Sequence, residues 1–385
     1  MSSCKSAWES RRRVWQPALQ AVFVQVNEAT MNHNIRIETG VIMDQEFWKD
    51  KKVLITGNNG FKGCWLNKWL DMMGADTLGI SLPAEKESIY HELRMSERHC
   101  YQELDIRNYN MLEQAVKKFR PEIVFHLAAQ AIVRTAKEEP VETFSANLMG
   151  TVNLLEALRH CDSIRAAVVV TSDKVYENTD EYIAFTEESK LGGNEPYSAS
   201  KACQELAVRA YRDTYFAELG VGLATARASN TFGGGDHHFD RLLPYLMKAS
   251  YEKQPIRLRN PEAIRPWQYI PDLLHGYIRL AECLYQNPVK YAQGYNFGPA
   301  KNDLFTVGEI AALLQPEHST ETQRTFCEAN ILMINSNKSR KELNWRPVIS
   351  VKEGMKRTEQ MYQAYFGGKS IDSLISEELK NYYEE

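Results

Sequence analysis

A phenol and an amine four residues apart are the strongest chemical signal in this sequence. Tyr197 and Lys201 follow Pro196 at the start of a long helical pattern, and this spacing places both side chains on one helical face. An ammonium group beside a phenol favours the phenolate, so we expect Lys201 to lower the pKa of Tyr197 from about 10 toward the working pH. The pair predicts a general base that removes a proton from a substrate hydroxyl.

A second polar group follows an apolar run that reads as a strand at 166–170. Ser172, Asp173 and Lys174 come just after this run. In an open parallel sheet, ligands gather at the carboxyl ends of the strands. A hydroxyl, a carboxylate and an amine at such an end predict a site, although a polar loop cap would have a similar sequence.

Three glycines at three-residue spacing lie near the head of the ordered pattern. A short apolar strand at 53–55 precedes Gly57, Gly60 and Gly63, and a helical apolar pattern runs from Phe61 to about residue 73. A strand, a glycine turn and a helix in this order bring helix N-terminal amides to a pyrophosphate. The stretch therefore predicts a dinucleotide site, to which we also assign Asn59.

The adenosine end of that site is less clear from the residues. The second strand, at 77–82, ends without the acidic residue that would hold an NAD ribose and without a nearby arginine for a 2′-phosphate. Asp105 and Ile106 fall where a third strand should end and are expected to face the adenine. A strand at 123–129 follows; we assign its Ala128 to the cofactor site and expect its His126 to pack rather than react.

The apolar spacing predicts strands and helices in alternation. Helical patterns cover 108–119, 140–160 and 196–218, and a further strand covers 221–228, after which the alternation loosens. Such alternation is typical of a parallel sheet with helices on both faces. We predict an α/β fold: a Rossmann-type doubly wound parallel sheet with a smaller, mixed α/β C-terminal substrate-binding domain.

Composition excludes several classes of protein. The 385 residues are 43% hydrophobic, which indicates a globular protein. Their formal net charge of −4 gives no sign of a basic surface for nucleic-acid binding. No apolar run is long enough for a membrane span. Seven scattered cysteines without a CxxC pair predict reduced thiols in the cytoplasm and no metal site.

Five further polar residues are candidates for substrate binding. Asn147 lies within a helical apolar pattern, where it is either a structural hydrogen-bonding residue or part of the site. Most arginines are solvated, but cations near glycine and proline turns suit a diphosphate. The substrate-binding set is Asn147, Asn230, Arg241, Arg259 and Arg265.

Five stretches together resemble a known family. They read TGNNGFKGCWL, TSDKVYEN, PYSASKA, GGGDHHFDRLLP and RNPEAIRPWQ. They are similar to the NAD-dependent epimerase/dehydratases, which are extended short-chain dehydrogenases/reductases, and within them to the CDP-glucose 4,6-dehydratases. The glycine turn and YxxxK are common to the superfamily, whereas GFKGxWL, SDK and AIRPWQ are selective. Asn58-Asn59 replaces a usual His-Thr, and Ser229 replaces a usual glycine.

The resemblance implies a function and a division of the chain. NAD would be the cofactor and a nucleotide sugar the substrate, and the product would be a 4-keto-6-deoxy sugar. Ser172, Asp173 and Lys174 would occupy the positions of Thr-Asp-Glu in related dehydratases. Residues 1–42 would form an N-terminal extension, which we expect to be disordered. Residues 43–230, with about 266–300, would form the Rossmann domain, and residues 231–265 with 301–385 the sugar-nucleotide domain.

Two rival functions remain open at this point. An epimerase of the same superfamily needs only Tyr197, Lys201 and Ser172, so the Asp173-Lys174 pair argues against it. A non-catalytic cofactor-binding protein typically loses Tyr197 or Lys201, and both are present here. The long helices at 140–160 and 196–218 offer surfaces for a homodimer by superfamily analogy.

Overall fold

A seven-stranded parallel sheet is the centre of the fold. The computed structural model describes residues 44–86, 88–95, 100–238, 241–301, 303–314, 318–320 and 329–384; the predicted extension at 1–42 lies outside them. The strand order is β11-β6-β5-β4-β1-β2-β3, and every neighbouring pair is parallel. The strands are β1 Lys52–Thr56, β2 Asp76–Ser81, β3 Cys100–Glu103, β4 Ile123–His126, β5 Ala166–Val170, β6 Gly222–Ala228 and β11 Gly294–Phe297.

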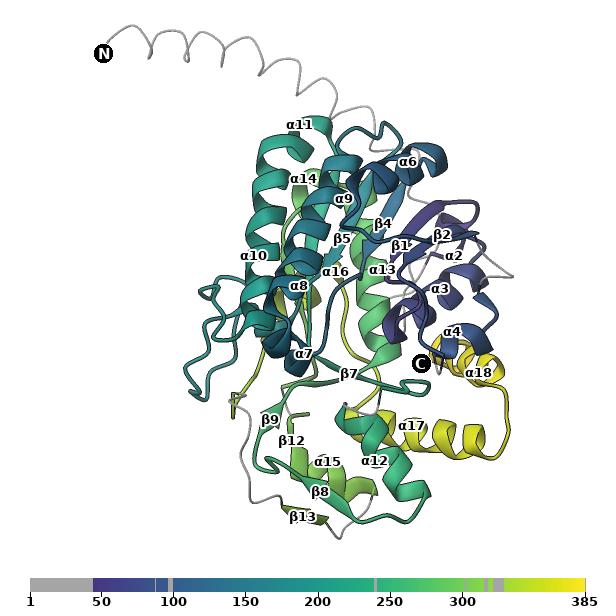
Figure 1. The fold of residues 1–385 in the computed structure, drawn as a ribbon, viewed down its shortest axis with the longest axis vertical. Helices are drawn as coiled ribbons and strands as arrows, with labels where there is room; N and C mark the ends of the chain where they lie inside the picture. The colour runs from purple at the N-terminus through teal and green to yellow at the C-terminus, as the bar shows by residue number, and fades with distance from the viewer. Residues whose placement is uncertain are drawn as a thin grey trace, which may run out of the picture. The chain divides into compact units, whose positions relative to one another are not determined.

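Helices cover both faces of this sheet (Figure 1). Successive strand residues point to opposite faces, so Val53 and Ile55 of β1 join one hydrophobic cluster and Leu54 joins another. The first cluster includes α3 (Phe61–Met72) and α13 (Ile270–Gln286). The helices that pack on the other face are α6 Tyr109–Phe119, α9 Gly150–Leu158 and α10 Pro196–Tyr211. The predicted doubly wound fold is confirmed.

The strand order reverses at β1, which lies between β2 and β4. Beside this reversal, the chain leaves the sheet at the ends of two adjacent strands, β1 and β4. The strand predicted at 123–129 stops at His126. The Leu127 N–H makes the last bond to the backbone of β1, at 3.0 Å from the Thr56 carbonyl, and the Ala128 N–H bonds to the Thr56 side chain instead. In doubly wound sheets such a switch point is where ligands bind, so the topology itself marks the site.

Two predicted helices are interrupted by π-helical turns. The predicted helix at 140–160 is α8 (Pro140–Phe144), a π segment (Ser145–Met149) and α9. Helix α10 likewise continues through a π segment (Arg212–Phe216) into α11 (Ala217–Leu219). Single π turns inside helices are frequent at functional sites, and the first of these contains Asn147.

The remaining elements follow β6 or connect the sheet strands. Figure 1 shows α12, α15 and α17 together beyond β7. The short strands pair as β7 (Asn230–Phe232) with β10 (Trp267–Tyr269), β9 (Ile264–Arg265) with β12 (Phe305–Thr306), and β8 (Ile256–Leu258) with β13 (His318–Thr320). The other helices are α2 Gln45–Trp48, α4 Ile89–Glu92, α7 Val133–Glu138, α12 Leu242–Tyr251, α14 Pro288–Tyr291, α15 Val307–Leu314, α16 Asn337–Leu343, α17 Val351–Phe366 and α18 Ile371–Tyr382. In the described part of the chain, no helix combines the length and apolarity needed to cross a membrane.

Candidate active site

Two of the three glycines are required by the packing of the turn after β1. Gly57 has a φ of +74°, and a Cβ there would lie 2.7 Å from the Ala128 nitrogen. A Cβ on Gly63 would overlap the Gly57 carbonyl oxygen. These two glycines let the helix α3 and the segment after β4 approach the turn closely.

Gly60 differs from its neighbours because the space beside it is open. It is the N-cap of α3 with a φ of −77°, and the nearest atom to a Cβ there would be the Gly57 oxygen at 3.5 Å. The space next to Gly60 adjoins the first turn of α3, which starts at Phe61 and whose N–H groups favour an anion. The turn therefore fits a dinucleotide pyrophosphate.

The predicted adenosine end is built from amide and hydroxyl groups. Asn59 donates from Nδ2 to the Leu82 carbonyl at 2.6 Å and also hydrogen-bonds the Tyr101 phenol. The Asn58 side chain is buried and accepts from Ser81 Oγ at 2.7 Å. Asn58 and Asn59, which stand in place of the family's usual pair, thus hydrogen-bond the turn to the end of β2.

The residues predicted to face adenine, Asp105 and Ile106, lie two and three positions beyond the end of β3. Asp105 pairs with Arg107, with Oδ2 2.6 Å from Nη2, and this contact holds the pKa of Asp105 below its usual value. Ile106 is 7% exposed and packs against Gly150 of α9. Ala128 lies across the turn, and its N–H bonds to Thr56 Oγ1 at 3.3 Å.

Tyr197 and Lys201 lie on the first two turns of α10. The Glu195 carboxylate caps this helix and accepts from the Tyr197 N–H at 2.7 Å. The two side chains are buried, with 9% of Tyr197 and 3% of Lys201 exposed. The Lys201 ammonium donates to the Val170 carbonyl at 3.2 Å and to Gln204 Oε1 at 3.0 Å.

Burial sets the pKa values of Tyr197 and Lys201, and the pKa of Tyr197 differs from the one that the sequence led us to expect. Desolvation raises the pKa of Tyr197 to about 12, although a hydrogen bond with Ser172 acts in the opposite direction. Desolvation and then the charge of Lys62 lower the pKa of Lys201 to about 7. The expectation that Lys201 brings the phenol toward neutrality is wrong for this structure, because removing the phenolate from water outweighs neighbouring charges.

Ser172, Asp173 and Lys174 occupy the carboxyl end of β5, as expected. Asp173 begins a short 3₁₀ turn (Asp173–Val175) and is 2% exposed. Ser172 Oγ donates to Asp173 Oδ1 at 3.1 Å, whereas Asp173 Oδ2 is buried without a hydrogen-bond partner among the described residues. Desolvation raises the pKa of Asp173 above its usual value, against the opposing charge of Lys174.

Lys62 is a member of this cluster that the sequence analysis did not single out. It lies in the first turn of α3, where burial and then Arg241 lower its pKa to about 8, while Asp173 and Asp236 raise it. The selective motif GFKGxWL contains this lysine, so the signal was present. A lysine at the start of the pyrophosphate-facing helix adds a cation between the turn and Asp173.

The predicted substrate residues divide into two groups. Arg241 pairs with Asp236 at 2.9 Å and contributes to the environment of Tyr197, and Arg265 is 6% exposed and lies near Asp173. Both belong to the cluster.

The other three are placed differently. Asn147 is fully buried and binds Gln130 and Ser200, with its Nδ2 2.9 Å from Ser200 Oγ. Asn230 begins β7, and Arg259 is exposed just beyond β8. Their contact with substrate stays a prediction.

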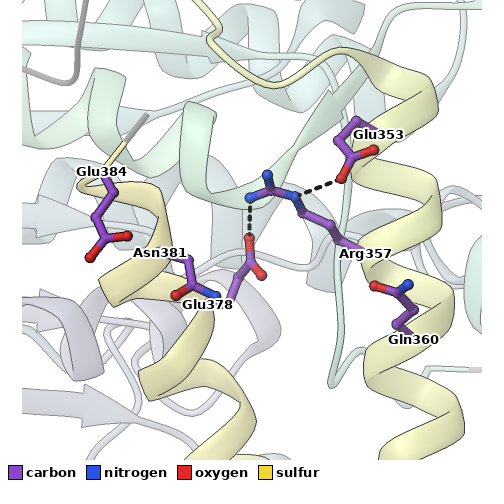
Figure 2. Close-up of a pocket in the computed structure, with 6 residues that line it drawn as sticks. All are labelled: Glu353, Arg357, Gln360, Glu378, Asn381 and Glu384. Carbon is purple, nitrogen blue, oxygen red and sulfur yellow. Dashed lines mark hydrogen bonds and ion pairs between the residues drawn. The ribbon is translucent and has the colours of Figure 1, made fainter.

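A separate hollow lies between α17 and α18 (Figure 2). Arg357 pairs with Glu353 on its own helix at 3.1 Å and reaches across the hollow to Glu378 of α18 at 3.2 Å. Its lining contains none of the residues of the cluster described above. The Arg357–Glu378 pair joins the two helices, and the lining offers no group suited to the chemistry of that cluster.

The fold places the chain first among proteins built on a doubly wound parallel sheet. The chain superposes on the UDP-glucose 4-epimerase of Thermotoga maritima with a TM-score of 0.72, at 20% identity, over 82% of this chain and 99% of that one. For the dTDP-glucose 4,6-dehydratase of Bacillus anthracis in complex with NAD, the TM-score is 0.69 at 22% identity, over 83% and 98%.

The sequence assigns the chain more narrowly. It belongs to the GDP-mannose 4,6-dehydratase family, whose sequence model matches residues 54–358. It is 37% identical over 353 residues to the CDP-glucose 4,6-dehydratase of Salmonella typhimurium, which covers 89% of this chain and 98% of that protein. The predicted resemblance is confirmed.

Proposed function

We propose that this chain is an NAD-dependent sugar-nucleotide 4,6-dehydratase that converts CDP-glucose to CDP-4-keto-6-deoxyglucose. One observation carries the proposal: Asp173, a buried carboxyl whose pKa is raised by desolvation, lies beside Tyr197 at the end of β5. An epimerase needs a base for the C4 hydroxyl only, whereas a dehydratase also needs an acid for the leaving 6-hydroxyl. The choice of CDP and glucose rests on the relative that shares 37% of its residues.

The first stage uses Tyr197 as the base. Its phenolate takes the proton of the sugar 4-hydroxyl. Ser172 hydrogen-bonds the phenol and Asp173, and it stabilises the developing oxyanion by turning its one hydroxyl proton from Asp173 to that oxygen. Lys201 lies on the same helical face as Tyr197, and its pKa near 7 lets it release a proton before the phenol does. The ammonium–phenolate form is then reached by proton transfer within the pair.

The second stage uses the end of β5. A ketone at C4 makes the C5 hydrogen acidic, so water can leave across C5 and C6. Burial raises the pKa of Asp173 above its usual value, which favours the protonated acid. Its Oδ2, which has no hydrogen-bond partner among the described residues, is the atom we assign to protonate the leaving 6-hydroxyl. Lys174 either takes the C5 proton in its neutral form or stays charged and stabilises the enolate.

NAD would supply the hydride acceptor at C4 and return the hydride to C6. The turn residues Gly57, Gly60 and Gly63 fit its pyrophosphate, since Gly60 leaves an open space at the start of α3. We assign Asn59, Phe61, Asp105, Ile106 and Ala128 to the same cofactor. The neutral end of β2, with Ser81 and Leu82, leaves no carboxylate to reject a 2′-phosphate, so the preference for NAD rests on the family.

We further propose a cytoplasmic homodimer. Five described cysteines (Cys64, Cys100, Cys161, Cys203 and Cys283) are unpaired, which supports a reducing compartment. Helix α10 packs beside the π segment and α8, and Val141, Met149 and Leu206 are exposed apolar side chains on these elements. A second copy would bury them.

The test is incubation of the purified chain with CDP-, dTDP-, GDP- and UDP-glucose, followed by mass measurement of the sugar nucleotide. We expect loss of one water from CDP-glucose and slower or no loss from the others. An unchanged mass with inversion at C4 would indicate the epimerase. Dinucleotide binding without turnover of any sugar would indicate the non-catalytic alternative.

A further inference from the structure

A continuous chain of buried hydrogen bonds leads from Lys201 away from the substrate side. Gln204 accepts from Lys201 through Oε1, and its Nε2 donates to Thr151 Oγ1 at 2.7 Å. Thr151 Oγ1 lies 2.9 Å from His126 Nε2, and His126 Nδ1 lies 2.6 Å from Thr56 Oγ1. Lys201 is 3% exposed, His126 is 1% exposed, and the other three are fully buried.

The chain joins four elements of the fold. It starts on α10, crosses α9 at Thr151 and β4 at His126, and ends at the last residue of β1. Thr56 immediately precedes Gly57, and its Oγ1 also accepts from the Ala128 N–H at 3.3 Å. These hydrogen bonds thereby connect Lys201 to Thr56, the residue at which the glycine-rich turn begins.

Every proton in this chain has one position. Thr151 Oγ1 donates its own proton to the Asn147 carbonyl at 2.7 Å, so it must accept from both Gln204 and His126. His126 therefore carries its proton on Nε2 and accepts from the Thr56 hydroxyl at Nδ1. The Gln204 amide is fixed in the same way, because its nitrogen faces Thr151 and its oxygen faces Lys201.

We propose that Gln204, Thr151 and His126 are positioning residues that hold Lys201 in one donor arrangement and fix it relative to the cofactor turn. The inference rests on the proposed role of the Tyr197–Lys201 pair. It gives His126 a function beyond the packing that its sequence position suggested. Burial, and then the charge of Lys201, keep the His126 ring neutral by lowering its pKa to about 3, so the donors at His126, Thr151 and Gln204 do not change near neutral pH.

The first test reads the tautomer of His126 without any activity measurement. The full chain is prepared with isotope-labelled histidine, and a His126→Gln variant identifies the His126 signals among the nine histidines. We expect a neutral ring with the proton on Nε2 from about pH 6 to about pH 8. A proton on Nδ1, or a ring that becomes charged in this interval, would overturn the proposal.

The second test uses the pH profile of kcat/KM. The ascending limb reports the first proton lost by the Tyr197–Lys201 pair, which leaves from Lys201. Thr151→Val removes the acceptor that orients Gln204, so the Lys201 ammonium loses a well-placed acceptor and its pKa falls. The ascending limb of kcat/KM should therefore move to lower pH by about one unit, and the maximum of kcat/KM should be reduced. Gln204→Met should act in the same direction, and Thr151→Ser should restore the wild-type limb.

A matched control is present in the chain. Thr358 of α17 is also fully buried and also donates to the carbonyl four residues earlier at 2.7 Å, yet it belongs to no such chain. Thr358→Val should leave the limb in place.

The groups that face the pair are unchanged in both valine variants. They are Lys62 from α3, His126 from β4, Ser172 and Asp173 after β5, Glu195 and Glu205 on α10 and Arg241 before α12.

The two tests separate failure of this proposal from failure of the proposed function. If the ascending limb of kcat/KM stays at the wild-type pH in Thr151→Val and Gln204→Met, and only the maximum of kcat/KM or the stability falls, the role of these residues is purely structural. That result would overturn the proposal. If the wild-type chain has no dehydratase activity, the proposed function fails, and the tautomer of His126 decides whether the hydrogen-bonded chain exists as described.

Discussion

Ser172 donates its hydroxyl proton to one oxygen of Asp173 at 3.1 Å, while the other oxygen of that carboxylate is buried without a partner among the described residues. Ser172 also hydrogen-bonds the Tyr197 phenol. Tyr197, the base for the first stage, and Asp173, the acid for the second, are therefore hydrogen-bonded to the same hydroxyl group. This arrangement keeps the two proton transfers adjacent, as a reaction at C4 and C6 of one sugar requires.

Asp173→Asn should separate oxidation from elimination. The amide keeps the shape of the side chain but cannot donate the proton of an acid, so C4 oxidation should proceed while loss of the 6-hydroxyl falls about 10²- to 10⁴-fold. Reduced cofactor should accumulate on mixing with CDP-glucose, visible by absorbance. Wild-type turnover in this variant would remove Asp173 from the mechanism.

Lys174→Met tests the residue that replaces the glutamate of related dehydratases. We expect C4 oxidation to remain partly intact and elimination to stall, because no group then removes the C5 proton or stabilises the enolate. Exchange of the C5 hydrogen in heavy water distinguishes this variant from Asp173→Asn, in which exchange should be less affected. If both variants dehydrate normally, the pair is structural and the epimerase gains support.

Tyr197→Phe retains the ring and removes the ionisable oxygen. The first oxidation should fall about 10²- to 10⁴-fold, which is the usual effect of losing a general base. Binding of the sugar nucleotide, measured by calorimetry, should change little. Turnover at the wild-type rate would contradict the assignment of this tyrosine and of the pair that it forms with Lys201.

Gly60→Val should abolish dinucleotide binding in a folded protein. The glycine has an ordinary φ and open space around it, so the side chain fits the protein but fills the place where a phosphate would lie. A thermal melt should be close to that of the wild type, while titration with NAD should show no binding. Gly63→Ala is the contrasting variant, because its Cβ overlaps the Gly57 carbonyl and should lower stability itself.

Asp272 makes a pH-dependent contribution to stability. It lies in the first turn of α13 and accepts from the Val348 N–H and the Tyr382 hydroxyl, both at 2.7 Å, yet burial raises its pKa from 3.8 to about 7. A carboxyl with a raised pKa in the folded state stabilises fully below its unfolded pKa, and this contribution is lost as pH rises through about 7.

Denaturant unfolding of the wild type and of Asp272→Asn measures this effect. The stability difference between them should shrink by about 1.4 kcal/mol per pH unit between about pH 4 and about pH 7. The exposed Asp213→Asn should give a difference that does not follow this slope. A constant difference for Asp272→Asn would show that this carboxyl does not titrate in that range.

Much of the sheet was predictable because its strands are short apolar runs bounded by polar turns. The strand at 166–170 matches β5, the pattern at 53–55 lies within β1, and the pattern at 221–228 starts one residue before β6. The helix at 108–119 begins one residue later, because Asn108 is its N-cap. Local pattern is enough where every residue of a strand is buried.

Other features depend on contacts that a linear pattern does not contain. Helix α18 was not predicted, although its Tyr382 bonds to Asp272 across the fold. The pKa of Tyr197 depends on burial by distant segments, and the position of Lys62 near Asp173 depends on how α3 meets the end of β5. The predicted domain boundaries stay predictions.

The most direct measurement follows the hydrogen that starts on C4. CDP-glucose carrying deuterium at C4 is incubated with the full chain and NAD, and the product is analysed by NMR and mass. A dehydratase with the roles proposed here must deliver the deuterium to C6 of a 4-keto-6-deoxy product with loss of one water. Deuterium that returns to C4 in a sugar nucleotide of unchanged mass would contradict the account.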